Sequence, residues 1–255
     1  MEFIDSHAHI YQSELKATLE DVLFRSHSNN VSKVVMPNVD SSSIEDMLDC
    51  EARFPGVCYA TIGLHPCYVK ENYRDELNIV RGWLDKRDFC AIGEIGIDLY
   101  HDTTFAEAQE ESFIQQVEWA LEKDLPVIIH TRSAFYEAVR ILKKLRHQQF
   151  KGVFHCFGGS IQDAETVIKM GFKLGIGGTV TYKNSGLNEV LKEIDLSHLL
   201  VETDAPYLTP VPYRGKPNEP SYIPLVAQKI AEIKNITVDE VAKATTRNAK
   251  DLFRI

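Results

Sequence analysis

Eight short apolar runs recur at regular intervals along the 255-residue chain. Each run is rich in valine, isoleucine and phenylalanine and is nearly continuous in apolarity, which is typical of strands buried on both faces of a parallel sheet. Eight such strands alternating with helices over about 250 residues predict a (β/α)8 barrel, the TIM barrel, as a single domain over 1–255. We expect the strands within 3–9, 32–38, 57–66, 89–98, 125–131, 152–159, 172–178 and 198–206.

Segments with helical spacing of apolar residues separate most of these runs. An open, doubly wound sheet is the alternative to the barrel, but the first run lacks the Gly-x-Gly-x-x-Gly turn of a dinucleotide-binding fold. The first and last runs also end in similar ionisable residues, as though both reach one centre. The barrel is therefore favoured. We expect helices within 14–28, 75–86, 104–124, 133–148, 161–170, 221–234 and 237–253.

The composition is that of a soluble globular protein. Hydrophobic residues make up 44% of the chain and charged residues 25%, and no apolar stretch approaches the ~20 residues that a transmembrane helix needs. The amino-terminal stretch MEFIDSH has neither the basic start nor the apolar run of a signal peptide. The five cysteines are scattered and form no Cys-x-x-Cys pair. We therefore predict a cytoplasmic protein with reduced thiols and no membrane partner.

The formal net charge of −9 limits how the chain can bind a polyanion. An acidic protein does not hold nucleic acid with its whole surface. If nucleic acid is a partner, contact must be confined to a local cationic patch or to bound metal ions.

Ionisable side chains stand where the strands are expected to end. In a (β/α)8 barrel the carboxyl ends of the strands converge on one face, and that face carries the active site. One such residue is easily explained as a polar strand end, but a set that includes five of the nine histidines is not. The set comprises His7 and His9 from the first run, His65 from the third, Glu94 from the fourth, His130 from the fifth, His155 from the sixth and Asp204 from the eighth.

The chemistry of this set points to metal ions. His7 and His9 lie two residues apart, so both point to the same side of a strand. Imidazole and carboxylate together are ligands for divalent transition metals. Four histidines and two carboxylates are too many for one closed tetrahedral site, and they suit two ions that share a carboxylate and lie ~3.5–4 Å apart.

The chain resembles the TatD family of metal-dependent deoxyribonucleases, a branch of the amidohydrolase superfamily. The resemblance lies in DSHAH, GLHP, GEIGID, HTR, HCFGG, ETDAP, RGKPNEP and the terminal TTRNAKDLF, which together span Asp5 to Phe253. It implies a first ion held by His7, His9, Glu94 and Asp204, and a second held by Glu94, His130 and His155, with Glu94 bridging the two.

The same resemblance implies a reaction, the hydrolysis of phosphodiester bonds in DNA from the 3′ end. Two divalent ions, drawn from Zn, Mn, Ni, Fe or Mg, are the implied cofactors. Glu94 and Asp204 are expected to be catalytic, with Asp204 taking the proton of the attacking water. His65 is expected to bind phosphate or stabilise the transition state rather than to ligate metal. DNA is the expected partner, and we expect a monomer with no obligate protein partner.

Two other interpretations keep the same ligands. The first is a small-molecule amidohydrolase or lactonase, or an esterase acting on an acyl group. Many such enzymes carry a carboxylated lysine, and here Glu94 fills the bridging role instead. The second is a metal-binding protein without activity, which is disfavoured because no ligand position has been lost.

Several further residues are candidates for substrate contact or for support of the ligands. Arg132 can hold a phosphate as a charged fork, and Arg214 and Lys216 can contact a nucleic-acid backbone. Tyr100 and Tyr182 can stack on bases. Asp98 and Glu202 are expected to orient ligands. The other histidines, His27, His101, His147 and His198, are predicted to be ordinary surface residues, and Cys156 a small apolar strand residue.

Overall fold

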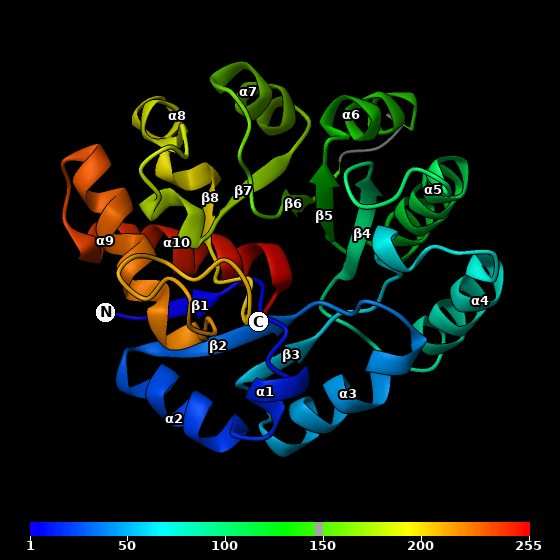
Figure 1. Ribbon diagram of the computed structural model, residues 1–255, viewed down its shortest axis with the longest axis horizontal. Coiled ribbons are helices and arrows are strands. Elements are labelled where there is room, and N and C mark those ends of the chain that lie inside the picture. Colours follow the sequence, from blue (N-terminus) through cyan, green and yellow to red (C-terminus); the bar gives the residue numbers. More distant parts are fainter. Residues whose placement is uncertain (146–149) are drawn as a thin grey trace.

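The computed structural model describes residues 1–145 and 150–255. Its eight strands are parallel and follow one another in space in the order of the chain, as sheets β1-β2-β3 and β4-β5-β6-β7-β8. Figure 1 shows the strands at the centre with helices α2 to α8 around them. The strands are β1 (Phe3–Asp5), β2 (Val31–Met36), β3 (Cys58–Ala60), β4 (Ile92–Asp98), β5 (Val127–Arg132), β6 (Gly152–Phe154), β7 (Phe172–Ile176) and β8 (Leu199–Val201).

Isolated bridges join the two sheets at both of their junctions. Ala8 pairs with Ala205 between the ends of β1 and β8, and Ile62 pairs with Ile92 between β3 and β4. Backbone hydrogen bonds support both junctions, from His9 N to Ala205 O at 2.7 Å and from Gly93 N to Ile62 O at 2.9 Å. The predicted (β/α)8 architecture is confirmed, although the ladder of strand pairs is not continuous around the ring.

The helices agree with the sequence pattern in most places. Helices α3 and α8 were not expected, and the segment 14–28 forms two helices because Thr18 leaves the helical conformation. The segment expected at 133–148 is helical to Lys144, and its positions 146–149, His147 among them, lie outside the described residues. The helices are α1 (Ser13–Lys16), α2 (Leu19–Ser28), α3 (Ile44–Arg53), α4 (Tyr73–Leu84), α5 (Ala106–Lys123), α6 (Phe135–Lys144), α7 (Ile161–Lys169), α8 (Leu187–Glu193), α9 (Ile223–Lys234) and α10 (Val238–Phe253).

Alternation along the strands separates an inner apolar layer from the layer under the helices. In β5, Ile128 belongs to the inner layer, whereas Val127 and Ile129 pack with the residues beneath the helices, as side chains on opposite faces of a strand must. The carboxyl end of α10 covers the inner layer through Leu252 and Phe253. The strand members of the inner layer are Ile4, Val35, Ile128, Val153 and Leu200, with Ala91 just before β4.

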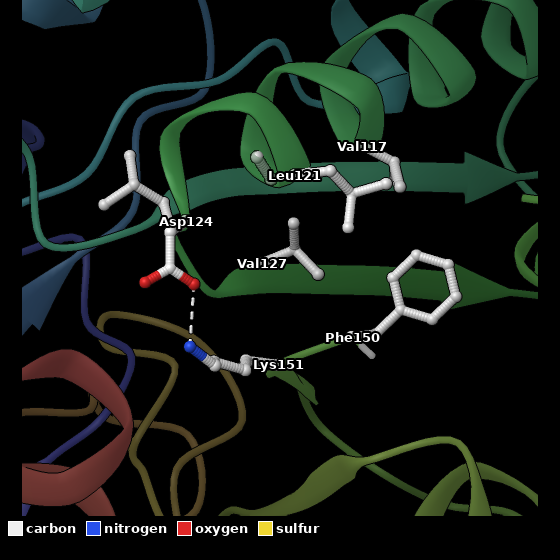
Figure 2. A pocket seen from close by; sticks show the side chains of 8 residues that line it. Val117, Leu121, Asp124, Val127, Phe150 and Lys151 are labelled. Atoms are coloured by element: carbon white, nitrogen blue, oxygen red, sulfur yellow. Dashed lines mark hydrogen bonds and ion pairs between the residues drawn. The ribbon is translucent and has the colours of Figure 1, made fainter. Parts of the chain in front are cut away.

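Among the described residues, the amino-terminal end of the barrel holds no group of metal-ligand type. A cavity of about 40 Å³ lies beside the start of β5, and Figure 2 shows Val127 and Phe150 among the side chains that line it. The Lys151 Nζ atom pairs there with Asp124 Oδ1 at 2.7 Å. The groups of metal-ligand type found in the described ranges all lie at the other end of the strands. Within those same ranges, no helix is both apolar and long enough to cross a membrane.

Candidate metal centre

The alternation of the inner layer continues to the carboxyl ends of three strands and there changes from apolar to ionisable residues. Residues two positions apart share a face, so the side chain two positions after each inner-layer residue also points into the barrel. This places two of the predicted histidines and two carboxylates at the mouth. They follow as His130 after Ile128, His155 after Val153, and Glu202 and Asp204 after Leu200.

Strands β1 and β4 reach the same centre by departing from this alternation. A bend at Ser6 follows β1, and His7 and His9 then turn inward together with their Nε2 atoms 3.2 Å apart. β4 shifts its register against β5 between Ile92 and Ile95. Glu94 lies within this shift, which turns its side chain toward the centre.

One oxygen of Glu94 faces the two histidines of β1. Its Oε2 lies 3.2 Å from His7 Nε2 and 3.5 Å from His9 Nε2. Asp204 faces the same two nitrogens, with its Oδ1 at 3.6 Å from His7 Nε2 and 3.7 Å from His9 Nε2. The four side chains predicted for the first ion are therefore in contact around one point.

The other oxygen of Glu94 faces three further histidines. Its Oε1 lies 3.0 Å from His130 Nδ1, 3.4 Å from His65 Nε2 and 3.6 Å from His155 Nε2. The two histidines predicted for the second ion are thus brought to the carboxylate predicted to bridge. His65 is equally close, although it was predicted to contact substrate and not metal.

The ring nitrogen that points away from Glu94 distinguishes His130 and His155, as metal ligands, from His65. His130 Nε2 lies 2.9 Å from the carboxylate of Asp98, and His155 Nδ1 lies 2.9 Å from that of Glu202. A carboxylate accepts, so the outer nitrogen carries a hydrogen, and in the neutral imidazole the inner nitrogen is the one left to bind an ion. In His65 the arrangement is reversed, because Nδ1 accepts the backbone N–H of Cys67 at 3.0 Å. Neutral His65 therefore presents an N–H to the centre.

The donor atoms of these residues are suitable for a pair of divalent ions. His130 Nδ1 and His155 Nε2 face the shared carboxylate of Glu94, and histidine nitrogens with carboxylate oxygens are suitable donors for divalent transition metals. The groups of donor atoms that lie within 4.8 Å of one another are His7, His9 and Glu94, then His7, His155 and Asp204, then His65, Glu94 and His130, and lastly Cys67, Asp98 and His101.

Burial and close charges set the protonation of these side chains in the protein alone. Although burial opposes it, the imidazoles of His65, His7 and His155 hold the pKa of Glu94 well below its usual range. Burial lowers the pKa of His7 well below its usual value. Burial also raises the pKa of Asp204 to about 6, although His155 and His9 oppose the rise. Glu94 is thus a carboxylate, and Asp204 is the more basic of the two.

Two glycines make space for the supporting groups. A Cβ atom on Gly175 in β7 would lie 2.2 Å from Glu202 Oε2, so only glycine leaves room there for the carboxylate that holds His155. Gly96 in β4 has a φ of +146°, and a Cβ on it would lie 1.9 Å from the carbonyl oxygen of His130. The close approach of β4 to β5, and hence of Glu94 to His130, depends on this glycine.

Sequence reasoning did not assign the polar residues that join β1 to β8. The buried carboxylate of Asp5 accepts hydrogen bonds from His7 N at 3.2 Å and from Thr203 N at 3.0 Å. Asn218 is also buried and donates to the carbonyl oxygens of Thr203 and Tyr207, each at 2.7 Å. The loop RGKPNEP thereby fixes the turn that carries Asp204. The signals in the sequence were the motifs DSHAH and RGKPNEP, which contain Asp5 and Asn218.

His101 corrects a prediction. It was grouped with the surface histidines, and its side chain is half exposed, but its Nδ1 lies 2.8 Å from Asp98 Oδ2 and it lines the cavity above the centre. No periodic pattern pointed to it, because it lies in the turn after β4 and not on a strand. His27 and His198 lie away from the lining residues, as expected.

An open cavity of about 740 Å³ lies over the centre. His65 and Arg132, the residues predicted to contact substrate, line it. Cys156, predicted to be a strand residue, lies just beyond β6 in the same wall. Arg214 lies outside the lining residues, with its guanidinium carbon 4.1 Å from the ring centroid of Tyr182. The Arg132 guanidinium carbon lies 4.0 Å from the centroid of Tyr100. Both arginines are thus stacked on the tyrosines that were expected to bind bases. All five cysteines are free, as predicted.

Comparison with known proteins gives consistent results. A family model described as TatD related DNase matches residues 4–254. The chain is 40% identical over 252 residues to the uncharacterized metal-dependent hydrolase YabD of Bacillus subtilis (strain 168), covering 98% of each chain. It is 33% identical over 260 residues to the uncharacterized metal-dependent hydrolase YcfH of Escherichia coli (strain K12), covering 100% of this chain and 97% of YcfH.

A solved structure agrees with these relatives. The crystal structure of YjjV, a TatD homologue from Escherichia coli K12, superposes with a TM-score of 0.93 at 32% identity, covering 99% of this chain and 98% of YjjV. With the side-chain cluster described above, these matches define the chain as a metal-dependent hydrolase. It belongs to the TatD related DNase family, which its motifs predicted.

Proposed function

We propose that the chain is a deoxyribonuclease that uses two divalent ions to hydrolyse phosphodiester bonds and removes nucleotides from the 3′ end of DNA. The observation that carries the proposal is the meeting of histidines and carboxylates around Glu94 at the floor of an open cavity that also holds the cation of Arg132. The first ion would be held by His7, His9, Glu94 and Asp204, and the second by Glu94, His130 and His155.

The ions supply Lewis acidity when bound, which activates water and stabilises negative charge on phosphoryl oxygens. The side chains do the rest. Asp204, whose pKa burial raises to about 6, accepts the proton of the attacking water. His65 donates its Nε2 hydrogen to a phosphoryl oxygen, because its Nδ1 already accepts the N–H of Cys67. Arg132 adds a second cationic contact from the cavity wall.

The shape of the cavity favours a strand end. The apolar layer beneath the centre closes the floor, so a strand cannot pass through and an end can enter. Tyr68, Tyr207 and Leu208 line the cavity and are exposed. Aromatic faces stack on bases of any sequence, and a terminal nucleotide entering the cavity would find such faces at its rim.

The test uses single-stranded and duplex oligonucleotides labelled at either end. We expect mononucleotides to be released first from the 3′ end, and we expect a chelator to abolish the release. His65→Ala should keep both ions and lose rate or substrate affinity, whereas the surface variant His198→Ala should behave as wild type. Hydrolysis of lactones or acyl esters without cleavage of any oligonucleotide would contradict the proposal and favour a small-molecule hydrolase.

A further inference from the structure

A separate group of ligand-type side chains, the Cys67 cluster, lies beside the centre and consists of Cys67, Asp98 and His101. Cys67 belongs to the short 3-10 helix η2 (Pro66–Tyr68), Asp98 ends β4, and His101 follows in the next turn. Asp98 Oδ2 lies 2.8 Å from His101 Nδ1 and 3.5 Å from Cys67 Sγ, and Cys67 Sγ lies 3.7 Å from His101 Nδ1. These three donor atoms belong to none of the ligand sets proposed above.

The spacing of the three donor atoms is close to that of a tetrahedral zinc site. Ligand bonds of ~2.3 Å for sulfur and ~2.0–2.2 Å for nitrogen and oxygen give donor separations of about 3.6 Å for each pair with sulfur and about 3.4 Å for nitrogen with oxygen. The two separations that involve Cys67 Sγ are 3.5 and 3.7 Å. Only the pair of Asp98 and His101, now joined by a hydrogen bond, has to move apart.

The aspartate of the cluster is held in place before any ion binds. The side chain of Asp98 is fully buried, and its Oδ1 accepts the backbone N–H groups of Tyr100 and His101, each at 2.9 Å. Gln109 fixes the backbone of the same residue, since its Oε1 accepts from Asp98 N at 2.8 Å. Asp98 Oδ2 is therefore aimed at the cluster by contacts that an ion would not disturb.

The cluster is open to the cavity, which leaves room for a fourth ligand. Cys67 and His101 both line the cavity wall, and His101 is half exposed. Three protein ligands with one open position are the pattern of zinc sites that exchange water or substrate. Burial raises the pKa of the Cys67 thiol to about 12, so an ion that binds there displaces the thiol proton to solvent.

We propose that Cys67, Asp98 and His101 form a third metal site, which takes thiophilic divalent ions such as Zn²⁺ and leaves Mg²⁺ and Mn²⁺ to the centre around Glu94. Thiolate is a soft ligand that selects zinc over the hard cations, whereas the centre around Glu94 offers only nitrogen and oxygen donors. The site does not depend on the proposed action on DNA.

An ion at this site would be coupled to the second ion. Asp98 Oδ2 also lies 2.9 Å from His130 Nε2, so the same oxygen would serve the third ion and the hydrogen bond that orients His130. Arg132 would change partners as well. Its Nη1 lies 3.4 Å from His101 Nε2, and this nitrogen must carry the hydrogen once Nδ1 is a ligand, so Arg132 is released toward the cavity.

The test is a titration of the metal-free protein with Co²⁺ under a reductant that contains no thiol. We expect three ions per chain and a near-ultraviolet charge-transfer band that reports a thiolate–cobalt bond. Cys67→Ala should bind two ions without the band, and Cys156→Ala, which removes another cysteine of the cavity wall, should keep it. With Mn²⁺, wild type and both variants should each bind two ions.

His101→Gln provides a second variant, because its side chain is half exposed and the fold should tolerate the change. It should lose the third ion while far-ultraviolet circular dichroism stays that of wild type. A wild-type protein without the band, a band that survives in Cys67→Ala, or a band that disappears in Cys156→Ala would overturn the proposal. Because no DNA enters the experiment, its outcome is separate from that of the deoxyribonuclease proposal.

Discussion

The hydrogen on each imidazole decides what the centre can bind. Asp98 and Glu202 hold hydrogens on the outer nitrogens of His130 and His155 and so leave the inner nitrogens free for ligands. The backbone N–H of Cys67 does the opposite to His65. Histidines with the same position on the barrel thereby acquire different chemistry from partners that no strand pattern reveals.

The first prediction at this scale concerns Asp204→Asn. Asparagine keeps the shape of the side chain and one donor oxygen, and it adopts the left-handed backbone conformation of this residue, φ +59°, as readily as aspartate. It loses the negative charge and most of the basicity. Turnover on DNA should fall at least about a hundredfold at saturating metal. The metal-free variant should unfold at nearly the wild-type temperature.

A matched control for this change is Asp251→Asn on the exposed face of α10, where Oδ2 lies 3.7 Å from Arg247 Nε. The control should retain wild-type turnover and melting temperature. Cleavage by Asp204→Asn within a few-fold of wild type would mean that the reaction takes place elsewhere.

The second residue-scale prediction concerns Glu202→Gln. The buried carboxylate oxygen Oε1 accepts from His155 Nδ1 at 2.9 Å and from the backbone N–H of Cys156 at 2.6 Å, and Oε2 has no partner within the described structure. An amide keeps the size but loses the charge that holds the hydrogen on His155 Nδ1. Affinity for the second ion should fall about 10–100-fold, measured by calorimetric titration with Mn²⁺. Glu232→Gln, on exposed α9, should leave that affinity unchanged, and an unchanged affinity in Glu202→Gln would refute the supporting role.

At the scale of elements, the close contact of β4 with β5 sets the spacing of the centre. Gly96→Ala should therefore destabilise the protein, because a Cβ would lie 1.9 Å from the His130 carbonyl oxygen at a φ of +146°. Strain and overpacking of this kind cost about 3 kcal/mol. The same substitution at Gly82 in α4, where a Cβ meets nothing within 4 Å, should stabilise by about 1 kcal/mol. Urea denaturation of both variants measures the change in the free energy of unfolding. A Gly96→Ala protein as stable as wild type would contradict this account.

The elements also show how far the sequence could predict the site. Alternation was a sufficient guide in β5, β6 and β8, where each inner-layer residue is followed at two positions by a side chain of the centre. It could not place Glu94, because the register of β4 shifts between Ile92 and Ile95. There the prediction relied on the position of Glu94 at the end of an apolar run, and its bridging role came from the family motifs. His101 was missed because it lies in a turn, and a turn has no regular alternation from which the direction of a side chain can be inferred.

The missed helices have a similar explanation. In α3 the buried residues Ile44, Met47 and Cys50 form a stripe one residue wide, and they follow a run of serines that is typical of a loop. Helix α8 has only 7 residues. Short helices of this kind owe their stability to the packing of the barrel rather than to local sequence. A (β/α)8 barrel places a helix after each strand, and this alternation, rather than their own residues, predicts the two helices.

At the scale of the whole molecule, the two ends of the barrel differ in role. Helix α10 and the inner apolar layer close one end, and the polar centre lies at the other, beneath an open cavity. The net charge of −9 is spread over a molecule whose predicted nucleic-acid contacts are few. Of those contacts, Arg132 lines the cavity, while Arg214 is exposed outside its lining residues. Binding of a polyanion must therefore rest on a small number of phosphate contacts and on the ions.

The final prediction follows from this distribution of charge. Each phosphate neutralised by a protein cation contributes about −0.9 to the slope of log affinity against log salt on duplex DNA and about −0.7 on single strands. With so few cationic groups near the mouth, we expect a total slope of about −1 to −3. Fluorescence anisotropy with a labelled oligonucleotide, using Asp204→Asn to prevent cleavage, measures it. Arg132→Gln should make the slope shallower by about one phosphate, whereas Arg247→Gln on exposed α10 should not change it. A much steeper slope would reveal a basic surface that neither the sequence nor the cavity indicates.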